Sequence, residues 1–461
     1  MKLKAAVLLW VITADAQALS LEESRHLALR TGFAVEASQL KQWQELTRQQ
    51  AVRQVLDSYQ PTRVSGLPGW LKTPSAPVRF RQLSASQKKQ AQQTQRQQGW
   101  QLKGWWLNQM IVTRSPFTER MLLFWHNHFT SALQKVKDPV MIYRQHALLR
   151  QQGLGNFQQL LTAIARDPAM LRYLDNRSNI KGKPNENFAR ELLELFTLGE
   201  GNYTEADVKA AARAFTGWGI NHKTRQFRFN SRRHDQAGKL FMGHRGNWDG
   251  DDILRMLLSD ARTAETVVRK AWRAFISPRP DPARVVYLAR QFRTADYNIR
   301  TLMRLLLNEP AFWAAENRGV LIKSPLMLLA GLGRTFQLRP GKQAVQLAHQ
   351  AARLGQDPFN PPNVKGWPGG ASWVSSQSLL LRQQLLTRFS RKPGQKQSMA
   401  MAGKRSKRPD YSAQLAAFNR RVSDKDKPDW LLVLPPAQPL AGKTGRALTA
   451  ALLQDPVYQL Y

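Results

Sequence analysis

The chain has 461 residues, of which 42% are hydrophobic, so it can bury a large core as one interlocked unit or as roughly two or three domains. Lys and Arg number 69 against 32 Asp and Glu, a formal charge of +37 that makes acidic partners the natural inference. There is no cysteine, which excludes disulfides, thiolate metal sites and a cysteine nucleophile.

The N-terminus has the pattern of a secretory signal peptide. A basic head at residues 1–4 precedes an apolar run at 5–14, and Ala16 and Ala18 place small residues where signal peptidase cuts. We predict cleavage after Ala18 and a mature protein that begins at Leu19, in the periplasm or secreted. No later stretch has the roughly 18 to 20 uninterrupted apolar residues of a membrane helix, so we expect no transmembrane anchor.

Export changes the expected partner of the positive charge. An exported basic protein meets lipopolysaccharide, teichoic or uronic polymers, sulfated glycans and anionic membrane surfaces. The expected partner is therefore an anionic polymer or surface glycan, and nucleic acid is less favoured.

Helix start signals recur along the whole chain. Ser20 precedes a helix at 20–31, Pro follows Ser115, Asp138 and Asp167, and a capping box opens at Thr204. Further helices are predicted at 37–59, 261–275, 281–294, 299–308, 324–335, 342–354 and 376–389, and residues 87–101 form a solvated helix or loop. The best strand candidates are 226–230 and 430–434. The predicted fold class is mainly α, a large multi-helix globular body with long loops and at most a few short strands.

Two histidines stand one residue apart in the sequence WHNHF at 125–129. If the backbone were extended they would share a metal, but the helix signals from Ser115 onward turn His126 and His128 about 200° apart. His126 stays a metal candidate, and it follows Glu119 by seven residues on the same helix face, which leaves an acid–imidazole pair open. The alternative for each imidazole is a place in the core or in solvent.

The loop at 173–185 gathers carboxylate and amide oxygens ahead of a helix. Asp175 and Asn185 are the types of ligand that a divalent cation such as calcium takes, so this loop is the second candidate metal site. Helix capping by Asn185 and Asx turns explain the same residues without a metal.

The helix that starts near Glu186 carries a charged face opposite an apolar one. Arg190 lies four residues from Glu186 and from Glu194, and Asn187 lies four from Glu191, a spacing that forms ion pairs on any exposed helix. Paired carboxylates also perform acid and base work on glycans. On that hypothesis Glu186, Arg190 and Glu191 are catalytic candidates and Asn187 is a binding candidate.

A glycine-containing loop follows at 234–246. His234 beside Asp235 can serve as a general base, and Lys239 can bind an anionic oxygen. His234 and Asp235 are therefore catalytic candidates and Lys239 a binding candidate. The alternative is an ordinary basic loop.

The segment NPPNVKGWPGGASW at 360–373 combines turn-forming residues with aromatic ones. Trp367 and Trp373 offer flat faces that stack on sugar rings, which makes them binding candidates. The same rings also fill protein cores.

Residues 388–408 contain eight basic residues and no acid, in a Gly-, Ser- and Pro-containing context that cannot bury enough apolar surface to order itself. We interpret this run as a surface linker or as a tether for an acidic polymer. The chain is thus divided into a signal peptide at 1–18, a helical main body at 19–387, a basic insertion or linker at 388–428, and elements at 429–461 that return to the main body.

Four of these segments, WHNHFT at 125–130, residues 185–218, HDQAGKLFMG at 234–243 and residues 360–373, together resemble the bacterial family catalogued as domain of unknown function 1800. The resemblance covers about residues 105–461. It implies an exported, largely helical protein, often encoded beside an uncharacterised sulfatase-like protein, which is thereby a candidate partner. The family has no established reaction, and the basic insertion departs from its pattern.

Two classes of function remain. The first is an exported factor that binds, or helps process, an anionic surface polymer such as an acidic or sulfated glycan. The second is a periplasmic hydrolase or lyase, with or without a metal, that uses residues of the Glu186 helix and the His234 loop. Convergence of these segments in one cleft would favour the enzyme.

Overall fold

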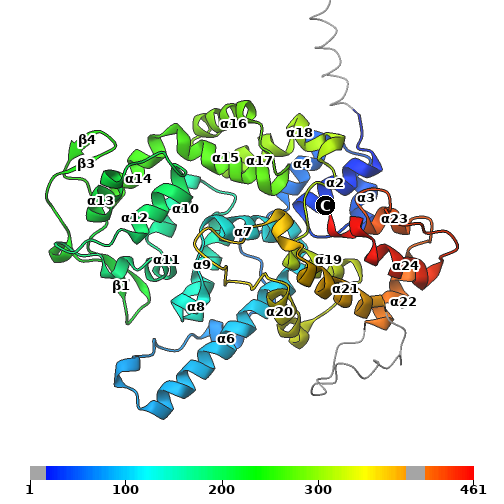
Figure 1. Cartoon of the computed structure of the whole chain (residues 1–461), viewed down its shortest axis with the longest axis horizontal. Coiled ribbons are helices and arrows are strands. Elements are labelled where there is room, and N and C mark those ends of the chain that lie inside the picture. The colour runs from blue at the N-terminus through cyan, green and yellow to red at the C-terminus, as the bar shows by residue number, and fades with distance from the viewer. Residues whose placement is uncertain (1–16, 391–410) are drawn as a thin grey trace, which may run out of the picture.

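The computed structural model describes residues 17–390 and 411–461. Helices make up most of this part of the chain, and its strands form two small two-stranded sheets (Figure 1). The predicted mainly α fold class is confirmed. Of the predicted leader and basic run, residues 1–16 and 391–408 lie outside the described residues.

The N-terminal elements are α2 (Leu21–Thr31), α3 (Ala37–Trp43), α4 (Arg48–Asp57), α5 (Gly69–Lys72), the 3-10 turn η1 (Phe80–Gln82) and the long α6 (Ala85–Val112). The prediction of one helix at 37–59 is wrong, because the chain turns after α3 and starts a new helix at Thr47. The Thr47 hydroxyl accepts a hydrogen bond from Gln50 N–H, and the Gln50 side chain accepts one from Thr47 N–H. This reciprocal bonding is a capping box.

The central elements are α7 (Pro116–His128), α8 (Leu133–Val136), α9 (Pro139–Gln152), α10 (Phe157–Ala165) and α11 (Pro168–Tyr173). As predicted, the side chains of Asp138 and Asp167 cap helices that begin with proline. Ser115 is the N-cap residue of α7, as predicted, but its hydroxyl donates to the Ser58 carbonyl and forms no capping hydrogen bond with the helix. Nearly every residue of α7 is buried, so this helix forms part of the centre of the core.

The next elements are the 3-10 turn η2 (Asn176–Ser178), α12 (Asn187–Glu191), the π-helix η3 (Leu192–Thr197), α13 (Glu205–Ala214), β1 (Trp218–Asn221), β2 (Gln226–Phe229), the 3-10 turn η4 (Ser231–Arg233), β3 (Lys239–Phe241) and β4 (His244–Gly246). The strand predicted at 226–230 is confirmed as β2, which pairs antiparallel with β1 so that Trp218 lies opposite Phe229. The second hairpin, β3–β4, pairs Phe241 with His244.

The C-terminal half continues through α14 (Gly250–Ser259), α15 (Ala261–Phe275), α16 (Pro282–Thr294), α17 (Ile299–Leu307), α18 (Pro310–Trp313), η5 (Ala315–Asn317), α19 (Pro325–Thr335), η6 (Gly341–Gln343), α20 (Ala344–Arg353), η7 (Gly370–Trp373), α21 (Ser376–Ser390), α22 (Ser412–Arg421), α23 (Lys427–Leu431), α24 (Gly445–Gln454) and η9 (Pro456–Gln459). The strand predicted at 430–434 is wrong, because Pro428 opens the helix α23 across its first residues. The last residues return to the preceding part of the chain, where Tyr461 N–H donates to the Leu321 carbonyl at 2.8 Å.

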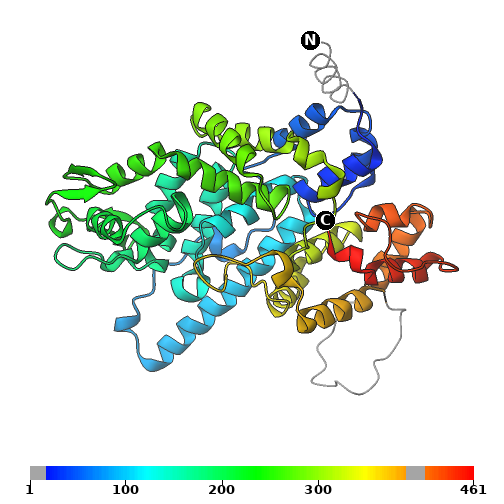
Figure 2. The same cartoon turned by 45° about the horizontal axis from the view of Figure 1, so that its top comes forward.

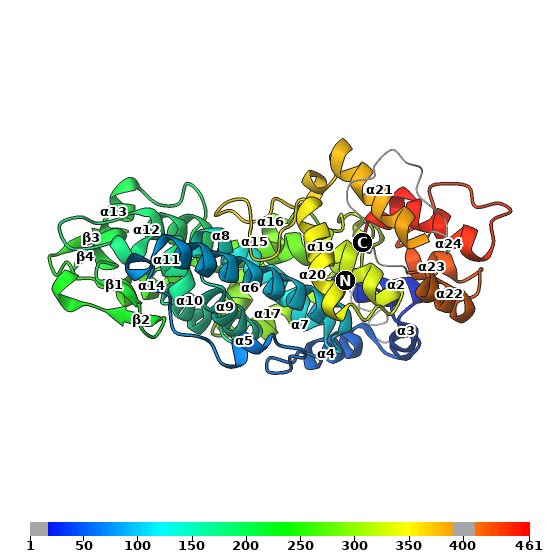
Figure 3. The ribbon, with the colours of Figure 1, turned by 90° about the horizontal axis from the view of Figure 1, so that it is seen from below.

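The two ends of the molecule are built from different parts of the chain. Helices α12 and α13 and both hairpins lie at one end, whereas α3 and α22–α24 lie at the other (Figures 1 and 3). The same separation holds in the tilted view (Figure 2). Across the described residues, no helix has both the length and the apolar character that crossing a bilayer requires.

Candidate functional site

Asn127, in the last turn of α7, joins this helix to the distant loop at 360–370. Its Oδ1 accepts a hydrogen bond from the Trp367 backbone N–H at 2.7 Å, and its Nδ2 donates to the Trp367 carbonyl at 3.4 Å. Gly366 lies against the same side chain with a φ of 87°, and a Cβ at this position would stand 2.3 Å from Asn127 Oδ1. The backbone can approach Asn127 this closely only because residue 366 is glycine.

The residue before this glycine, Lys365, extends to the α12–η3 helix. Its Nζ lies 3.4 Å from Glu194 Oε1, and Glu194 Oε2 accepts a hydrogen bond from the Tyr203 hydroxyl at 2.9 Å. Glu191 is one helical turn away and half-buried, and it interacts electrostatically with both Glu194 and Lys365. We call Glu191, Glu194, Tyr203 and Lys365 the Glu191 cluster.

A π-helix supports this cluster. The wider turn of η3 leaves carbonyl groups outside the normal helical pattern, and side chains satisfy them: Lys270 Nζ donates to the Leu195 carbonyl at 2.6 Å and Thr197 Oγ1 donates to the Leu192 carbonyl at 2.7 Å. Short π-helical turns occur frequently at functional sites. Here the turn places Glu194 next to Lys365.

The environment changes the proton affinity of the cluster. Burial raises the pKa of the Glu191 carboxyl, and the charge of Glu194 raises it further, although Lys365 opposes the change. Burial and the hydrogen bond to Glu194 raise the pKa of Tyr203 to about 12. A carboxyl that binds a proton more readily than usual thus stands beside a second carboxylate that is hydrogen-bonded and ion-paired. A carboxyl with a raised pKa next to a second carboxylate is a feature of many acid–base sites.

Two of the catalytic candidates on this helix, Glu186 and Arg190, form an ion pair with each other. Arg190 donates to both oxygens of Glu205 on α13, at 2.6 and 2.8 Å, and to Glu186 at 3.0 Å. These hydrogen bonds, above all those to Glu205, raise the pKa of Arg190. The arrangement ties α12 to α13, and only Glu191 of the three catalytic candidates on this helix belongs to the Glu191 cluster.

The polar side chains of the loop ahead of α12 bind other groups of the protein. Asp175 forms an ion pair with Lys135 at 2.8 Å, and Asn185 Oδ1 accepts from the Asn187 N–H at 3.0 Å as in an Asx turn. The Asn187 side chain donates to the Leu174 carbonyl at 3.1 Å. In residues 17–390 and 411–461, no three His, Asp or Glu side chains are placed to hold a metal ion together.

The His234 loop packs on the other end of α13. His234 is buried and its Nδ1 lies 3.0 Å from the Thr216 carbonyl, whereas Asp235 accepts a hydrogen bond from Arg213 Nε at 2.7 Å. That hydrogen bond, reinforced by the charge of Arg213, lowers the pKa of Asp235 to about 2. Lys239 Nζ donates to the Asp235 carbonyl at 2.7 Å. His234 and Asp235 bind different partners, and the loop contributes no side chain to the Glu191 cluster.

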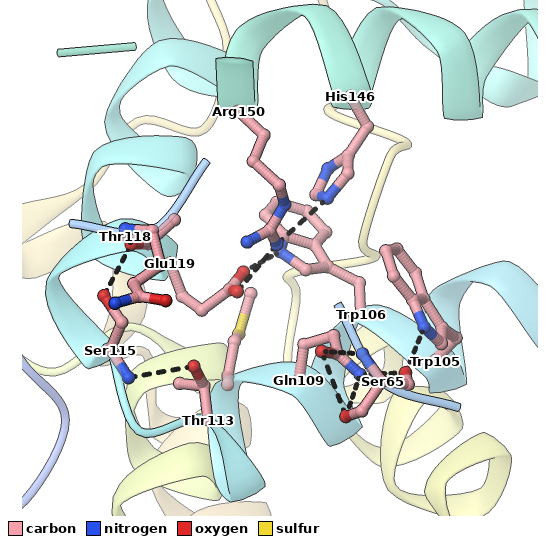
Figure 4. A network of polar contacts seen from close by, with 12 residues as sticks. Ser65, Trp105, Trp106, Gln109, Thr113, Ser115, Thr118, Glu119, His146 and Arg150 are labelled. Carbon is pink, nitrogen blue, oxygen red and sulfur yellow. Dashed lines mark hydrogen bonds and ion pairs between the residues drawn. The ribbon is translucent and has the colours of Figure 1, made fainter. Parts of the chain in front are cut away.

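His126 belongs to a polar network that is buried inside the protein. Its Nε2 lies 3.0 Å from His146 Nδ1. Figure 4 shows the rest of the network, in which His146 contacts Arg150 and Arg150 donates to Glu119 at 2.6 Å. Trp106 Nε1 donates to the other oxygen of Glu119 at 3.1 Å. Glu119 and His126 are therefore linked through two intermediate residues. Burial, reinforced by Arg150, lowers the pKa of His126 to about 3, so this imidazole is neutral and enclosed.

Trp367 and Trp373 are enclosed as well. Their exposed fractions are 5% and 6%. Both residues are therefore buried and present no open face to a sugar.

Four residues of the site were not among the candidates from sequence: Asn127, Glu194, Tyr203 and Lys365. Lys365 and Asn127 stand within two of the segments that carry the family resemblance, so the motifs contained the signal without indicating which member mattered. Glu194 and Tyr203 lie in a third such segment, residues 185–218, but the role of Tyr203 depends on where the chain after η3 returns.

Comparison with known proteins identifies the family to which nearly the whole chain is similar. The model of the family described as "Protein of unknown function (DUF1800)" matches residues 26–460. Neither the curated proteins nor the solved structures contain a match. The match spans the Glu191 cluster, the His234 loop and the described C-terminal helices.

Proposed function

The chain belongs to the DUF1800 family, and from that premise we propose that it is an exported protein that binds an anionic surface polymer, such as an acidic or sulfated glycan, and helps process it. The observation that carries this proposal is the imbalance of charge. With 69 basic against 32 acidic side chains, one-to-one ion pairing leaves more than half of the cations without a carboxylate. Such an excess attracts polyanions and is screened by salt.

The surface of the described residues agrees with this proposal. Lys181, Lys183, Arg232 and Arg233 are exposed near the hairpins, and no carboxylate among the described residues pairs with them.

At the N-terminal side, Leu19 is buried and its N–H donates to the Leu46 carbonyl at 2.9 Å. The residue that follows the proposed cleavage point is thus packed against the body of the protein.

Retention of the exported protein on an acidic polysaccharide resin tests this function. We expect retention on a polyuronate or sulfated resin, elution that follows the salt concentration, and no retention on a neutral dextran resin. N-terminal sequencing of the protein from the periplasm or medium should begin at Leu19. Elution that is indifferent to salt would contradict the electrostatic proposal, and an intact leader on cytosolic protein would contradict export.

A second proposal, a hydrolase or lyase, is favoured by one observation, the raised pKa of Glu191 next to Glu194. His234 and Asp235 form hydrogen bonds outside the Glu191 cluster. In this second proposal, the acid–base pair therefore consists of Glu191 and Glu194. A sulfatase-like partner, which the family resemblance implies, would act on the same polymer.

Turnover of a panel of acidic glycans tests the enzyme proposal. Wild type should be active, Glu191→Gln should lose the activity, and Glu205→Gln should retain it, because Glu205 is an exposed ion-pair partner outside the Glu191 cluster. Absence of turnover by wild type, or equal activity in wild type and Glu191→Gln, would refute catalysis at this site.

A further inference from the structure

A groove lies at the end of the molecule opposite the Glu191 cluster. It has a volume of about 670 Å³ and runs between α3, the end of α4, the turn from α6 to α7, the turn after α19, and α22–α23. Figures 1 and 3 place these elements far from α12 and α13.

Arginines dominate the charged lining of this groove. Arg114, Arg334, Arg339 and Arg421 line it, and Glu36 is the only acidic residue among the described residues of its lining. Glu36 pairs with Arg334, whose other terminal nitrogen donates to the carbonyls at the end of α6. In the described part of the chain, the remaining three arginines have no carboxylate partner. The groove therefore holds three uncompensated positive charges.

One of these arginines is already oriented. Arg421 Nη2 donates to the Thr335 carbonyl at 3.0 Å, and its guanidinium lies 5.9 Å from the centre of the Trp430 ring. A guanidinium held at fixed geometry can form paired hydrogen bonds with a carboxylate or a sulfate. Trp430 is half-buried, so part of its ring remains open to the groove.

The uncharged lining suits a sugar. Gln39, Gln42 and Gln54 line the groove, and Gln54 Oε1 accepts a hydrogen bond from Trp43 Nε1 at 2.6 Å, which leaves its amide nitrogen available. Among the described residues, the side chains of Gln39 and Gln42 have no hydrogen-bond partner. Amides, which both donate and accept, match sugar hydroxyls, while an aromatic ring matches the apolar face of a sugar ring.

We propose that this groove is the binding site for an anionic polysaccharide, which deepens, and rests on, the proposed function. Acidic groups of the polymer bind Arg114, Arg339 and Arg421, and a sugar ring lies against Trp430. A concave groove with amide donors and acceptors favours a flexible glycan chain over a flat membrane surface. A single half-buried tryptophan offers few stacking positions for the successive bases of a nucleic acid.

Affinity measurements with matched variants test the site. The probes are a heparin hexasaccharide and a galacturonate oligosaccharide, titrated into the full-length mature protein and followed by calorimetry. The groove variant is Arg114→Gln with Arg339→Gln, and the control is Lys88→Gln with Lys89→Gln, which removes the same charge from exposed positions on α6. We expect the groove variant to weaken binding at least about tenfold and the control less than about twofold.

The possible results distinguish a failure of the proposed groove site from a failure of the proposed function. Equal weakening in both variants would show that binding depends on overall charge, which overturns the groove and leaves the proposed function standing. No binding of either probe by wild type would overturn both. Tighter, groove-dependent binding of a single-stranded oligonucleotide or of phosphatidylserine vesicles would overturn the assignment to a glycan. Unchanged urea unfolding of both variants serves as the folding control.

Discussion

The junction of Gly366 with Asn127 can be tested by adding a single methyl group. Gly366→Ala places a Cβ 2.3 Å from Asn127 Oδ1 and puts a non-glycine residue at a φ of 87°. The left-handed conformation costs roughly 1–2 kcal/mol, and displacement of Asn127 loses its hydrogen bonds to Trp367, about 1 kcal/mol each. We expect a loss of about 2–4 kcal/mol in the free energy of unfolding.

Two companion variants separate the clash from the backbone strain. Gly370→Ala has a φ of 56° and no atom within 4 Å of its Cβ, so it should cost only the conformational term, about 1–2 kcal/mol. In the double variant Gly366→Ala with Asn127→Ala, the clashing side chain is gone, although the Asn127 carbonyl remains 3.0 Å from the new Cβ. The double loss should therefore fall below the sum of the single losses by about 1–2 kcal/mol.

Urea unfolding followed by circular dichroism measures these three variants and the single variant Asn127→Ala. Losses that add to within about 0.5 kcal/mol would show that Gly366 and Asn127 are not coupled, and would refute the junction. An equal loss in the free energy of unfolding for Gly366→Ala and Gly370→Ala would show that contact with Asn127 adds no cost, and would also refute the junction.

Three further predictions concern the interior. Glu119→Ala leaves Arg150 buried without its carboxylate, so we expect a loss of about 3–5 kcal/mol in urea unfolding, and a loss below about 1 kcal/mol would contradict the network. The pKa of His126 is about 3 against an ordinary 6.5, so the unfolded chain binds a proton in this window that the folded chain does not. Stability should therefore decline as the pH falls below 6.5, by up to about 1.4 kcal/mol per pH unit from this residue, and His126→Gln should reduce the slope between pH 7 and 5. If the slope is unchanged, His126 is not the source. Lys270→Met removes the donor to the Leu195 carbonyl, so we expect a loss of about 1 kcal/mol and faster amide exchange in η3, and exchange as slow as in wild type would argue against this support.

Local signals in the sequence predicted most of the helices. Asp138, Asp167 and Thr204 cap helices where expected, because an N-cap depends only on the side chain and the next three residues. The same kind of signal explains the errors. The capping box at Thr47 splits the helix predicted at 37–59, and Pro428 starts a helix where an alternating pattern indicated a strand.

The candidate site was predicted only in part. The polar face of the helix after Glu186 was visible from its spacing, and its apolar residues Phe188 and Phe196 are buried as that spacing requires. The roles of the polar residues were not predictable, because Arg190 binds Glu205 on the next helix while Glu194 binds Lys365, far along the chain.

By itself, the sequence determined the charge excess, the absence of cysteine chemistry, the helical class and the family, since these depend on composition and on short-range patterns. Only the tertiary structure decided which polar groups meet. Burial of the apolar faces brings Asn127 to Gly366, encloses Trp367, and leaves Arg114, Arg339 and Arg421 around one groove. The hydrophobic effect that drives this packing is non-directional, so the pairing of distant side chains follows from the shape of the whole core and not from any local motif.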